Sequence, residues 1–468
     1  MRRLATSAGA LLLLAGCSTV SIDDALQESN ERAAQFTQGQ LALERSPQDR
    51  ERRAALAGEL LAQPLTQDGA VRLALTNSPA LQALLADQWG QLEAANQLGR
   101  MPNPVFSFER MRVGEELEIG RLISFGLVDL ILLPRRLSMA QSQADQAKLQ
   151  LTGVVVDQVT QVRQAWVRAV AAQQSLRYAQ QVNESAAASA ELARRMQQVG
   201  NFSRLQRARQ QAFHADAATQ LALAQQAVVA SREALVRSLG LDDTQAASLT
   251  LPERLPALPA APRDGADVSA SAAQQRIDLQ MARAQLDFAG QSQGINRLST
   301  YLDAELGLRH DSLFDNAGGQ RATRRGFELD IALPLFDWGG TRREQLDAQS
   351  LAAAQRYEAT ARAATSQLRE SYGAYRTAYD IARHYRDEVV PLRQAVAEEN
   401  QLRYNGMLIG VFELLADARE QVASVRSAIE AQQQFWLADA ALAASVIGRP
   451  MGSTGISAAR ALPAAAPH

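Results

Sequence analysis

The side chains that could carry out chemistry are sparse, and they form no catalytic pattern in the sequence. A Walker A motif and a GxGxxG motif are both absent. Pairs of Glu and Asp along helices are more typical of solvated helix faces than of acid–base catalysis. The sequence therefore predicts a protein that is not an enzyme, with no metal site and no bound cofactor. The four histidines stand in separate segments without the i, i+4 partner of an HExxH metal site: His214, His310, His384 and His468.

One pair of acidic residues, Glu413 and Asp417, has a spacing suited to attracting cations. Glu413 and Asp417 are four residues apart, so on a helix they share one face. Carboxylates gathered in this way favour cations and can be bridged by divalent ions. The alternative is that Asp417 pairs with an arginine such as Arg419 on a neighbouring helix.

The N-terminal segment contains the chain's one cysteine, Cys17. Two arginines precede a short apolar stretch over residues 8–15, which is typical of a secretory signal and too short to span a bilayer. Leu14-Ala15-Gly16-Cys17 resembles the lipobox of bacterial lipoproteins, in which the cysteine is lipidated. We expect a signal peptide over residues 1–16 and a palmitate-type lipid anchor on Cys17. An ordinary signal peptide with an unrelated cysteine is the alternative.

The elements that must position the acidic pair are very long helices. Residues 135–251 contain no proline, and Gly200-Asn201 is the one clear break in their heptad pattern. Ser203 can cap the next helix, which ends at Gly240. As one helix, residues 136–199 would be about 95 Å long, so some part of this protein must span a distance. The apolar seam includes Val155, Val159, Val162 and Trp166.

A second hairpin of the same kind follows. Residues 200–211 align without a gap to residues 410–421, with Gly, Phe, Leu, Ala, Arg and Gln in common. A match of this kind indicates a duplicated unit, with two unrelated hairpins as the alternative. We expect helix from about Arg342 to Tyr404, with a kink or junction at Pro391, and again from about Phe412 to Ile447.

Strand-like segments precede both hairpins. Apolar and polar residues alternate in residues 300–310 and 325–335, which predicts two strands joined by an exposed loop. Their polar face includes Asp303, Glu305, Glu328 and Asp330. The earlier pair, over residues 104–130, alternates less clearly, because Arg110 and Arg112 share a face with Phe106 and Phe108.

Net charge and the positions of prolines and glycines complete the expected division of the chain into segments. A net charge of −2 lacks the basic footprint of a nucleic-acid-binding protein. We expect an N-terminal arm over 17–64, a first repeat over 65–250 with its hairpin at 135–240, a proline-rich linker over 251–267, a second repeat over 268–450 with strands at 300–335 and a hairpin at 342–447, and a disordered tail over 451–468.

This duplicated order of helix, strand pair, very long helix, turn and long helix resembles the TolC-like outer-membrane efflux family in its lipid-anchored form. The resemblance covers residues 66–450, and Ile277 departs from it where the family usually has proline. The motifs that carry it are Ala74 to Leu81, Arg276 to Leu279, Leu333 to Gly340, and the turn at Tyr404-Asn405-Gly406 followed by Glu413.

The strands must be shared between subunits if they lie in a membrane. Four strands cannot close a barrel, and each unpaired backbone group in lipid costs several kcal/mol. Two chains would give eight strands, whose interior fills with side chains, and three would give twelve, the first plausible pore. The expected fold is therefore mainly α, with duplicated hairpins forming an α-barrel and four strands per chain contributing to a trimeric 12-stranded transmembrane β-barrel. The family resemblance also implies a trimer.

The resemblance implies the outer-membrane channel of a tripartite efflux or type I secretion system. It implies a homotrimer in outer-membrane lipid that extends into the periplasm and reaches an inner-membrane pump through a periplasmic adaptor. The exported substrates would be small molecules or metal ions. The rival class is a structural coiled-coil lipoprotein that tethers envelope components, which does not explain the strand pairs.

The resemblance also assigns sites. Glu413 and Asp417 are the candidate periplasmic gate, with Ala416 at the family's second acidic position. The alternative for the apolar residues beside the turns is that they pack the interior of their own hairpins. The candidate adaptor-docking tips are Gly200, Phe202 and Leu205 at the first turn, and Gly410, Phe412 and Leu415 at the second.

Overall fold

The computed structural model describes residues 20–114, 116–299, 303–315, 318–332, 335–336 and 338–450. The expected signal peptide, Cys17 and the expected disordered tail lie outside the described residues. The described chain divides into two compact units. Unit 1 takes its residues from 1–28, 86–151 and 278–362, and unit 2 from 29–85, 152–277 and 363–468. Each unit therefore combines segments of both sequence repeats.

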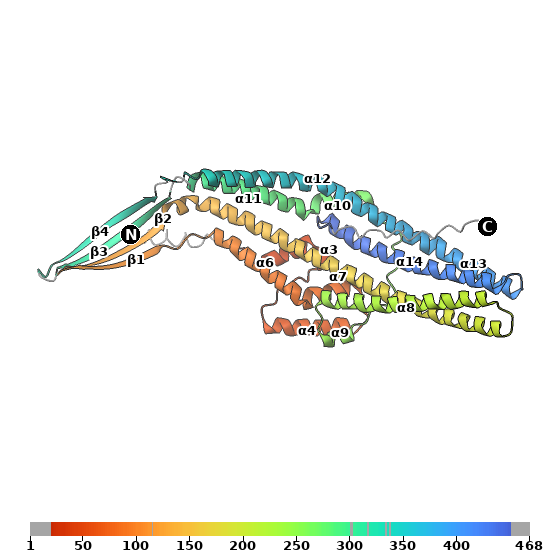
Figure 1. Cartoon of the computed structure of the whole chain (residues 1–468). Coiled ribbons are helices and arrows are strands. Elements are labelled where there is room, and N and C mark those ends of the chain that lie inside the picture. The colour runs from red at the N-terminus through yellow and green to blue at the C-terminus, as the bar shows by residue number, and fades with distance from the viewer. Residues whose placement is uncertain are drawn as a thin grey trace. The chain divides into compact units, whose positions relative to one another are not determined.

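Most of the described chain is helical (Figure 1). The N-terminal arm contains α2 (Ile22–Arg32), α3 (Ala34–Thr37) and α4 (Pro47–Leu61). The first repeat contains α5 (Gln67–Asn77), α6 (Pro79–Leu98), α7 (Leu127–Gln198), α8 (Arg204–Leu239) and α9 (Asp243–Ser248). The second contains α10 (Gly265–Gln275), α11 (Ile277–Ser299), α12 (Gly340–His384), η1 (Tyr385–Val389), α13 (Val390–Asn405) and α14 (Val411–Val446). In this part of the chain no helix is both long and apolar enough to cross a membrane.

Helix α7 begins earlier than the sequence indicated. It starts at Leu127, directly after a strand, so Pro134 lies inside the helix instead of ending the segment before it. A proline removes one backbone hydrogen bond and crowds the preceding turn. Here Leu132 is buried, and Arg136 pairs with Asp129 across the proline at 2.5 Å. These contacts hold the first turns of the helix together.

The strands form one antiparallel sheet in unit 1, in the order β1-β2-β3-β4 (Figure 1). Their bounds are β1 (Val105–Val113), β2 (Glu116–Gly126), β3 (Asp303–Asp315) and β4 (Arg321–Ala332). The loop expected over residues 311–324 is wrong in extent, because both strands continue into it. Ser312 pairs with Thr323 and also with Ile119 of β2. Most side chains there are polar, so the sequence lacks the alternation that predicts a strand, but backbone hydrogen bonds to β2 extend β3 through Asp315.

The core of unit 2 joins the proline-rich linker to the second repeat. Tyr375 and Tyr379 of α12 pack on Phe435 of α14, with ring centroids 5.6 and 5.7 Å apart. The Tyr379 hydroxyl donates to the Pro259 carbonyl at 3.1 Å, and Trp436 Nε1 donates to the Pro256 carbonyl at 3.1 Å. The linker is irregular but fixed, and it ends at α10, three residues before the expected boundary.

A junction is present where Pro391 predicted one. The π-helical turn η1 separates α12 from α13, and Pro391 is the second residue of α13. A π turn is a common way to accommodate a local irregularity in a long helix. In the first repeat, α7 continues through its whole length without such a turn.

Candidate functional site

The sheet of unit 1 has two chemically different faces. The register pairs Phe106 with Ile123, Ile123 with Leu308, and Leu308 with Phe327, so these four residues lie on one face. We call it the aromatic face. It is open to the surroundings, since Phe106 is 61% exposed and Phe327 is 77% exposed. Other apolar residues on this face include Phe108, Leu117, Ile119, Phe125, Leu306, Phe314, Leu329 and Ile331.

The opposite face carries Glu109, Glu305, Glu328 and Asp330, and we call it the carboxylate face. Arg309 lies among these acids. Its guanidinium group is 3.3 Å from Glu109, 3.0 Å from Asp311 and 3.4 Å from Glu328. Gly120 lies beside the cluster, where a Cβ would make ordinary contact at 3.4 Å with Asp311 Oδ1 and Glu109 Cβ. The polar face predicted for the second strand pair is thus present and continues onto β1.

The outer strands of the sheet have open edges. Within the described sheet, β1 pairs only with β2, and β4 pairs only with β3. Every residue of β1 is exposed. An exposed strand edge is a template for pairing with another strand. The sheet therefore has the surfaces required for strand-to-strand association between copies.

The first hairpin turn, in unit 2, follows the predicted plan. Gly200 has φ +82°, a left-handed conformation that glycine adopts without strain. Ser203 caps α8 by accepting from the Gln206 backbone N–H, and Gln206 accepts in return from the Ser203 N–H. Phe202 is buried against its hairpin, whereas Leu205 is 62% exposed. Of the two apolar residues predicted here for docking, only Leu205 presents its side chain to the surroundings.

The second turn is built differently from the first. The left-handed residue is Met407, with φ +56°, and Gly410 is the extended N-cap of α14 with φ −84°. Met407 and Leu408 are 93% and 73% exposed, although the sequence analysis did not select them. The available signal was an apolar pair directly after Asn405-Gly406. Leu415 is half-buried, and the Phe412 side chain lies outside the described set.

The acidic pair occupies the first turns of α14. Glu413 is exposed, and Asp417 is half-buried. Asp417 accepts a hydrogen bond from the side-chain amide of Asn400 on α13. The expected alternative partner, Arg419, instead lies 4.4 Å from the Phe213 ring centroid and donates to Gln210 Oε1 at 3.1 Å. The Asp417 carboxylate is therefore held by a neutral amide, and its charge is not neutralised by Arg419.

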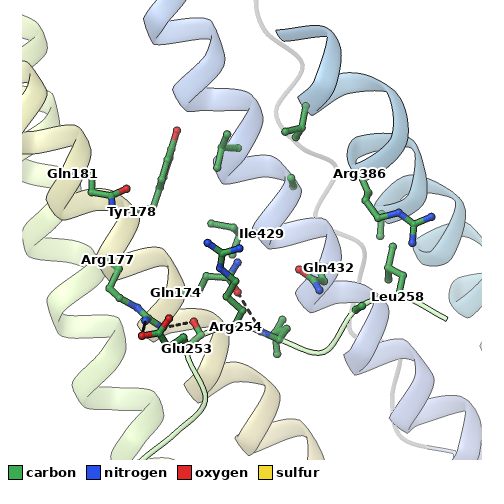
Figure 2. A pocket seen from close by; sticks show the side chains of 16 residues that line it. Gln174, Arg177, Tyr178, Gln181, Glu253, Arg254, Leu258, Arg386, Ile429 and Gln432 are labelled. Carbon is green, nitrogen blue, oxygen red and sulfur yellow. Dashed lines mark hydrogen bonds and ion pairs between the residues drawn. The ribbon is translucent and has the colours of Figure 1, made fainter. Parts of the chain in front are cut away.

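A cavity of about 770 Å³ lies in unit 2 between α7, the linker, η1 and α14 (Figure 2). Arg177 pairs with Glu253 at 3.2 Å at one side of it. Burial raises the pKa of the Tyr178 phenol. The mixed lining could accept an amphipathic molecule, but it brings together no nucleophile and base. Its walls include Gln174, Gln181, Leu258, Arg386, Ile429 and Gln432.

Residues with metal-binding side chains stay apart. Within the described ranges, no group of three or more His, Cys, Asp or Glu side chains is placed to hold a metal ion. His310 lies on β3 and His384 on α12, while His214 lies on α8.

Comparisons with known proteins agree with this architecture. The family model described as outer membrane efflux protein matches residues 268–447, which form most of the second repeat. No curated protein has a matching sequence.

Solved structures share the fold along most of the chain. VceC, an outer membrane protein of Vibrio cholerae, has a TM-score of 0.67 at 17% identity, covering 85% of this chain and 98% of VceC. A membrane protein from Pseudomonas aeruginosa has a TM-score of 0.66 at 19% identity, covering 84% of this chain and 93% of its own. The open state of the MtrE outer membrane channel of Neisseria gonorrhoeae has a TM-score of 0.64 at 17% identity, covering 82% and 89%.

The fold is thus mainly α, with long helical hairpins and a four-stranded antiparallel sheet. The second repeat matches the outer membrane efflux family, and the chain shares its fold with the outer-membrane proteins named above.

Proposed function

We propose that this chain is the outer-membrane channel of a tripartite efflux or type I secretion system. Three copies would pool their strands into a barrel of 3 × 4 = 12 strands, and the helical hairpins would line a tunnel through the periplasm. The observation that carries this proposal is the sheet, with one exposed aromatic face and two open edges, in a chain whose second repeat matches the outer membrane efflux family.

The two faces of the sheet suit the two sides of a barrel wall. Transmembrane barrels place apolar side chains toward lipid and polar ones toward the lumen. The aromatic face would meet lipid, and Glu305, Glu328 and Asp330 would line the pore. Pairing β4 of one copy with β1 of the next would satisfy backbone groups that are very costly to leave unpaired in lipid.

The other parts of the system follow from the same proposal. A lipid on Cys17 would add an anchor beside the barrel, since acyl chains hold proteins to membranes without a transmembrane helix. The hairpin turns would receive a periplasmic adaptor and, through it, an inner-membrane pump. Leu205, Met407 and Leu408 offer exposed apolar side chains for that contact. The channel needs no cofactor in this role.

The candidate periplasmic gate, Glu413 and Asp417, provides an experimental test of the proposed channel function. We propose that Glu413 and Asp417 from three copies form a carboxylate ring that narrows the tunnel and favours cations. Purified protein in planar bilayers should give cation-selective conductance that divalent ions block. Glu413→Ala with Asp417→Ala should raise conductance and weaken both the selectivity and the block.

The matched control is Glu51→Ala with Glu59→Ala, which removes the same charge from exposed positions on α4. This variant should conduct like the parent protein. Equal behaviour of the gate variant and this control would place the gate elsewhere. Absence of any conductance from the parent protein, together with a monomeric mass in mild detergent, would favour the structural lipoprotein instead.

A further inference from the structure

Positive charge is gathered on the aromatic face of the sheet. The register places six basic side chains there and, among the described strand residues, no Asp or Glu. We call these six residues the basic belt. They are Arg110 and Arg112 of β1, Arg121 of β2, His310 of β3, and Arg321 and Arg325 of β4.

The basic belt follows the apolar part of the same face along the strands. The cross-strand row Phe106, Ile123, Leu308 and Phe327 is entirely apolar. The next row toward the hairpin turns contains Phe108, Arg121 and Arg325, and two rows further Arg112 and Arg321 appear. At about 3.3 Å per residue, the belt begins about 7 Å beyond the apolar row and continues to about 20 Å beyond it. Basic residues first appear in the same row of both strand pairs, and Ile119, Leu117 and Phe314 lie among them in the rows beyond.

Four arginines of this belt have no acidic partner among the described residues. Arg110, Arg112, Arg321 and Arg325 are exposed, and no carboxylate of the described residues forms an ion pair with them. Arg321 lies over the Phe314 ring at 5.5 Å, and Arg121 donates to Ser312 Oγ at 3.3 Å.

On the carboxylate face, by contrast, the arginines are paired. Arg309 has three acidic partners, and Arg324 pairs with Glu118 at 3.6 Å. The belt therefore contains four exposed arginines without an acidic partner among the described residues, and it directly adjoins the exposed apolar row of the same face.

We propose that the basic belt binds the phosphate groups of phosphorylated lipids in the leaflet near the strand turns. Arginine presents a planar fork that binds phosphate in bidentate fashion, and its apolar stem can lie along a hydrophobic surface while its head reaches the headgroup region. Phosphorylated lipid is favoured over a protein partner because the belt lies on the aromatic face, directly beside the apolar row that would meet lipid. The inference rests on the proposed function, since it requires the aromatic face to meet a membrane.

Arg324 and Arg325 provide a matched pair for the test, because they are neighbours on β4 that project to opposite faces. The purified full-length parent protein, Arg325→Gln and Arg324→Gln would be titrated with lipid A that carries phosphate and with dephosphorylated lipid A. Bound lipid would be counted by native mass spectrometry. The combined variant Arg110→Gln, Arg112→Gln, Arg321→Gln and Arg325→Gln extends the series.

We expect the combined variant to bind phosphorylated lipid at least about tenfold more weakly, as the loss of charge-assisted hydrogen bonds implies. Arg325→Gln should weaken binding, Arg325→Lys should retain part of it, and Arg324→Gln should bind like the parent protein. The dephosphorylated lipid should bind all variants equally weakly.

Equal binding by Arg325→Gln and Arg324→Gln, or equal binding of the two lipids by the parent protein, would overturn the proposal. Competition by inorganic phosphate at concentrations similar to the lipid would also overturn it, because the site would then recognise free phosphate. Conductance of the same preparations separates the two hypotheses. A parent protein that conducts but shows no preference for phosphorylated lipid contradicts the belt alone, whereas a parent protein that never conducts contradicts the channel.

Discussion

The two helical hairpins of unit 2 end in helices of the same length, α8 and α14, with 36 residues each. Their N-caps, Ser203 and Gly410, are 410 − 203 = 207 residues apart. The sequence match pairs Gly200 with Gly410 at an offset of 210, and it therefore aligns residues with different roles. Helix length is the same in the two copies, whereas the residues that reverse the chain differ.

The difference shows which features a hairpin turn requires. Each turn needs one left-handed residue and one N-cap, and more than one residue type can serve. The first turn uses Gly200 and Ser203, and the second uses Met407 and Gly410, which has no side chain to cap with. A left-handed methionine is strained, and the Met407 side chain is 93% exposed. A partner that covers this side chain would bury more apolar surface at the second turn than at the first.

The cores of the hairpins also differ. Phe435 of α14 is 1% exposed and packs on two tyrosines, whereas Val228, its counterpart 207 residues earlier, is half-buried. Both hairpins contact the linker, since Arg177 of α7 pairs with Glu253 and Trp436 of α14 donates to the Pro256 carbonyl. Three pairs of substitutions test whether the two hairpins differ in this way, and they are given in order of decreasing expected effect.

The largest effect is expected in the aromatic core. Phe435→Ala leaves a cavity between Tyr375 and Tyr379 and should lower the free energy of unfolding by about 3–5 kcal/mol. Val228→Ala should cost no more than about 1.5 kcal/mol, since it removes little from a half-buried position. Thermal unfolding followed by circular dichroism at equal protein concentration measures both. Similar losses in the two variants would contradict the unequal cores.

A serine placed at each turn glycine should have effects of opposite sign. A Cβ at Gly200 or Gly410 meets nothing within 4 Å, so backbone conformation alone separates the two sites. Gly200→Ser should destabilise by about 1–2 kcal/mol, because a side chain disfavours the left-handed region. Gly410→Ser should stabilise by a few tenths of a kcal/mol, because serine caps a helix slightly better than glycine. The midpoint of thermal unfolding reports the sign of each, and the same sign at both sites would refute the assigned conformations.

The smallest effect concerns pH, and its sign also differs between the hairpins. Hydrogen bonds from Arg194 and Arg195 lower the pKa of Glu191 on α7 to about 2. The resulting stability is present above the ordinary pKa of 4.5 and is lost as the pH falls toward 2. Glu191 is exposed, so salt should screen the effect.

Asp439 on α14 behaves in the opposite way. Burial raises its pKa, although Arg263 lies 2.9 Å away and acts to lower it. The stability linked to this proton is full below pH 3.8 and is lost as the pH rises through the raised pKa. The midpoint of Asp439→Asn relative to the parent protein should therefore rise as the pH rises from 3.8. That of Glu191→Gln should rise only as the pH falls below 4.5, and a parallel response of the two variants would contradict the assignment.

Much of the architecture could be predicted from local patterns. Heptad spacing indicated long helices, Gly200 and Ser203 indicated the first turn, and Pro391 indicated a junction, because each of these acts within a few residues of the chain. The limits of β3 and β4 could not be predicted from residues 311–324. Most of these residues are polar, and it is pairing with neighbouring strands, of β3 with β2 and of β4 with β3, that extends the two strands into this segment.

The site residues divide in the same way. The sequence placed Glu413 and Asp417 on one helix face, as the helical period requires, but it suggested Arg419 as the alternative partner where the structure has Asn400. The partner depends on how α13 packs beside α14, and local spacing does not contain that information. The exposure of Met407 and Leu408 was missed for the same reason.

The sequence by itself determined helix, turn and strand wherever a short-range period or a turn residue sets the backbone. The sequence also contains Arg110 and Arg112, which share a face with Phe106 and Phe108. In the sequence alone, these two arginines make the alternation of β1 irregular. Only the tertiary structure decided what those arginines mean. Pairing across four strands places Arg112 in the same row as Arg321 and Arg110 one row from Arg325, although these arginines of β4 are far away in the chain, and so makes an irregular strand part of one basic belt.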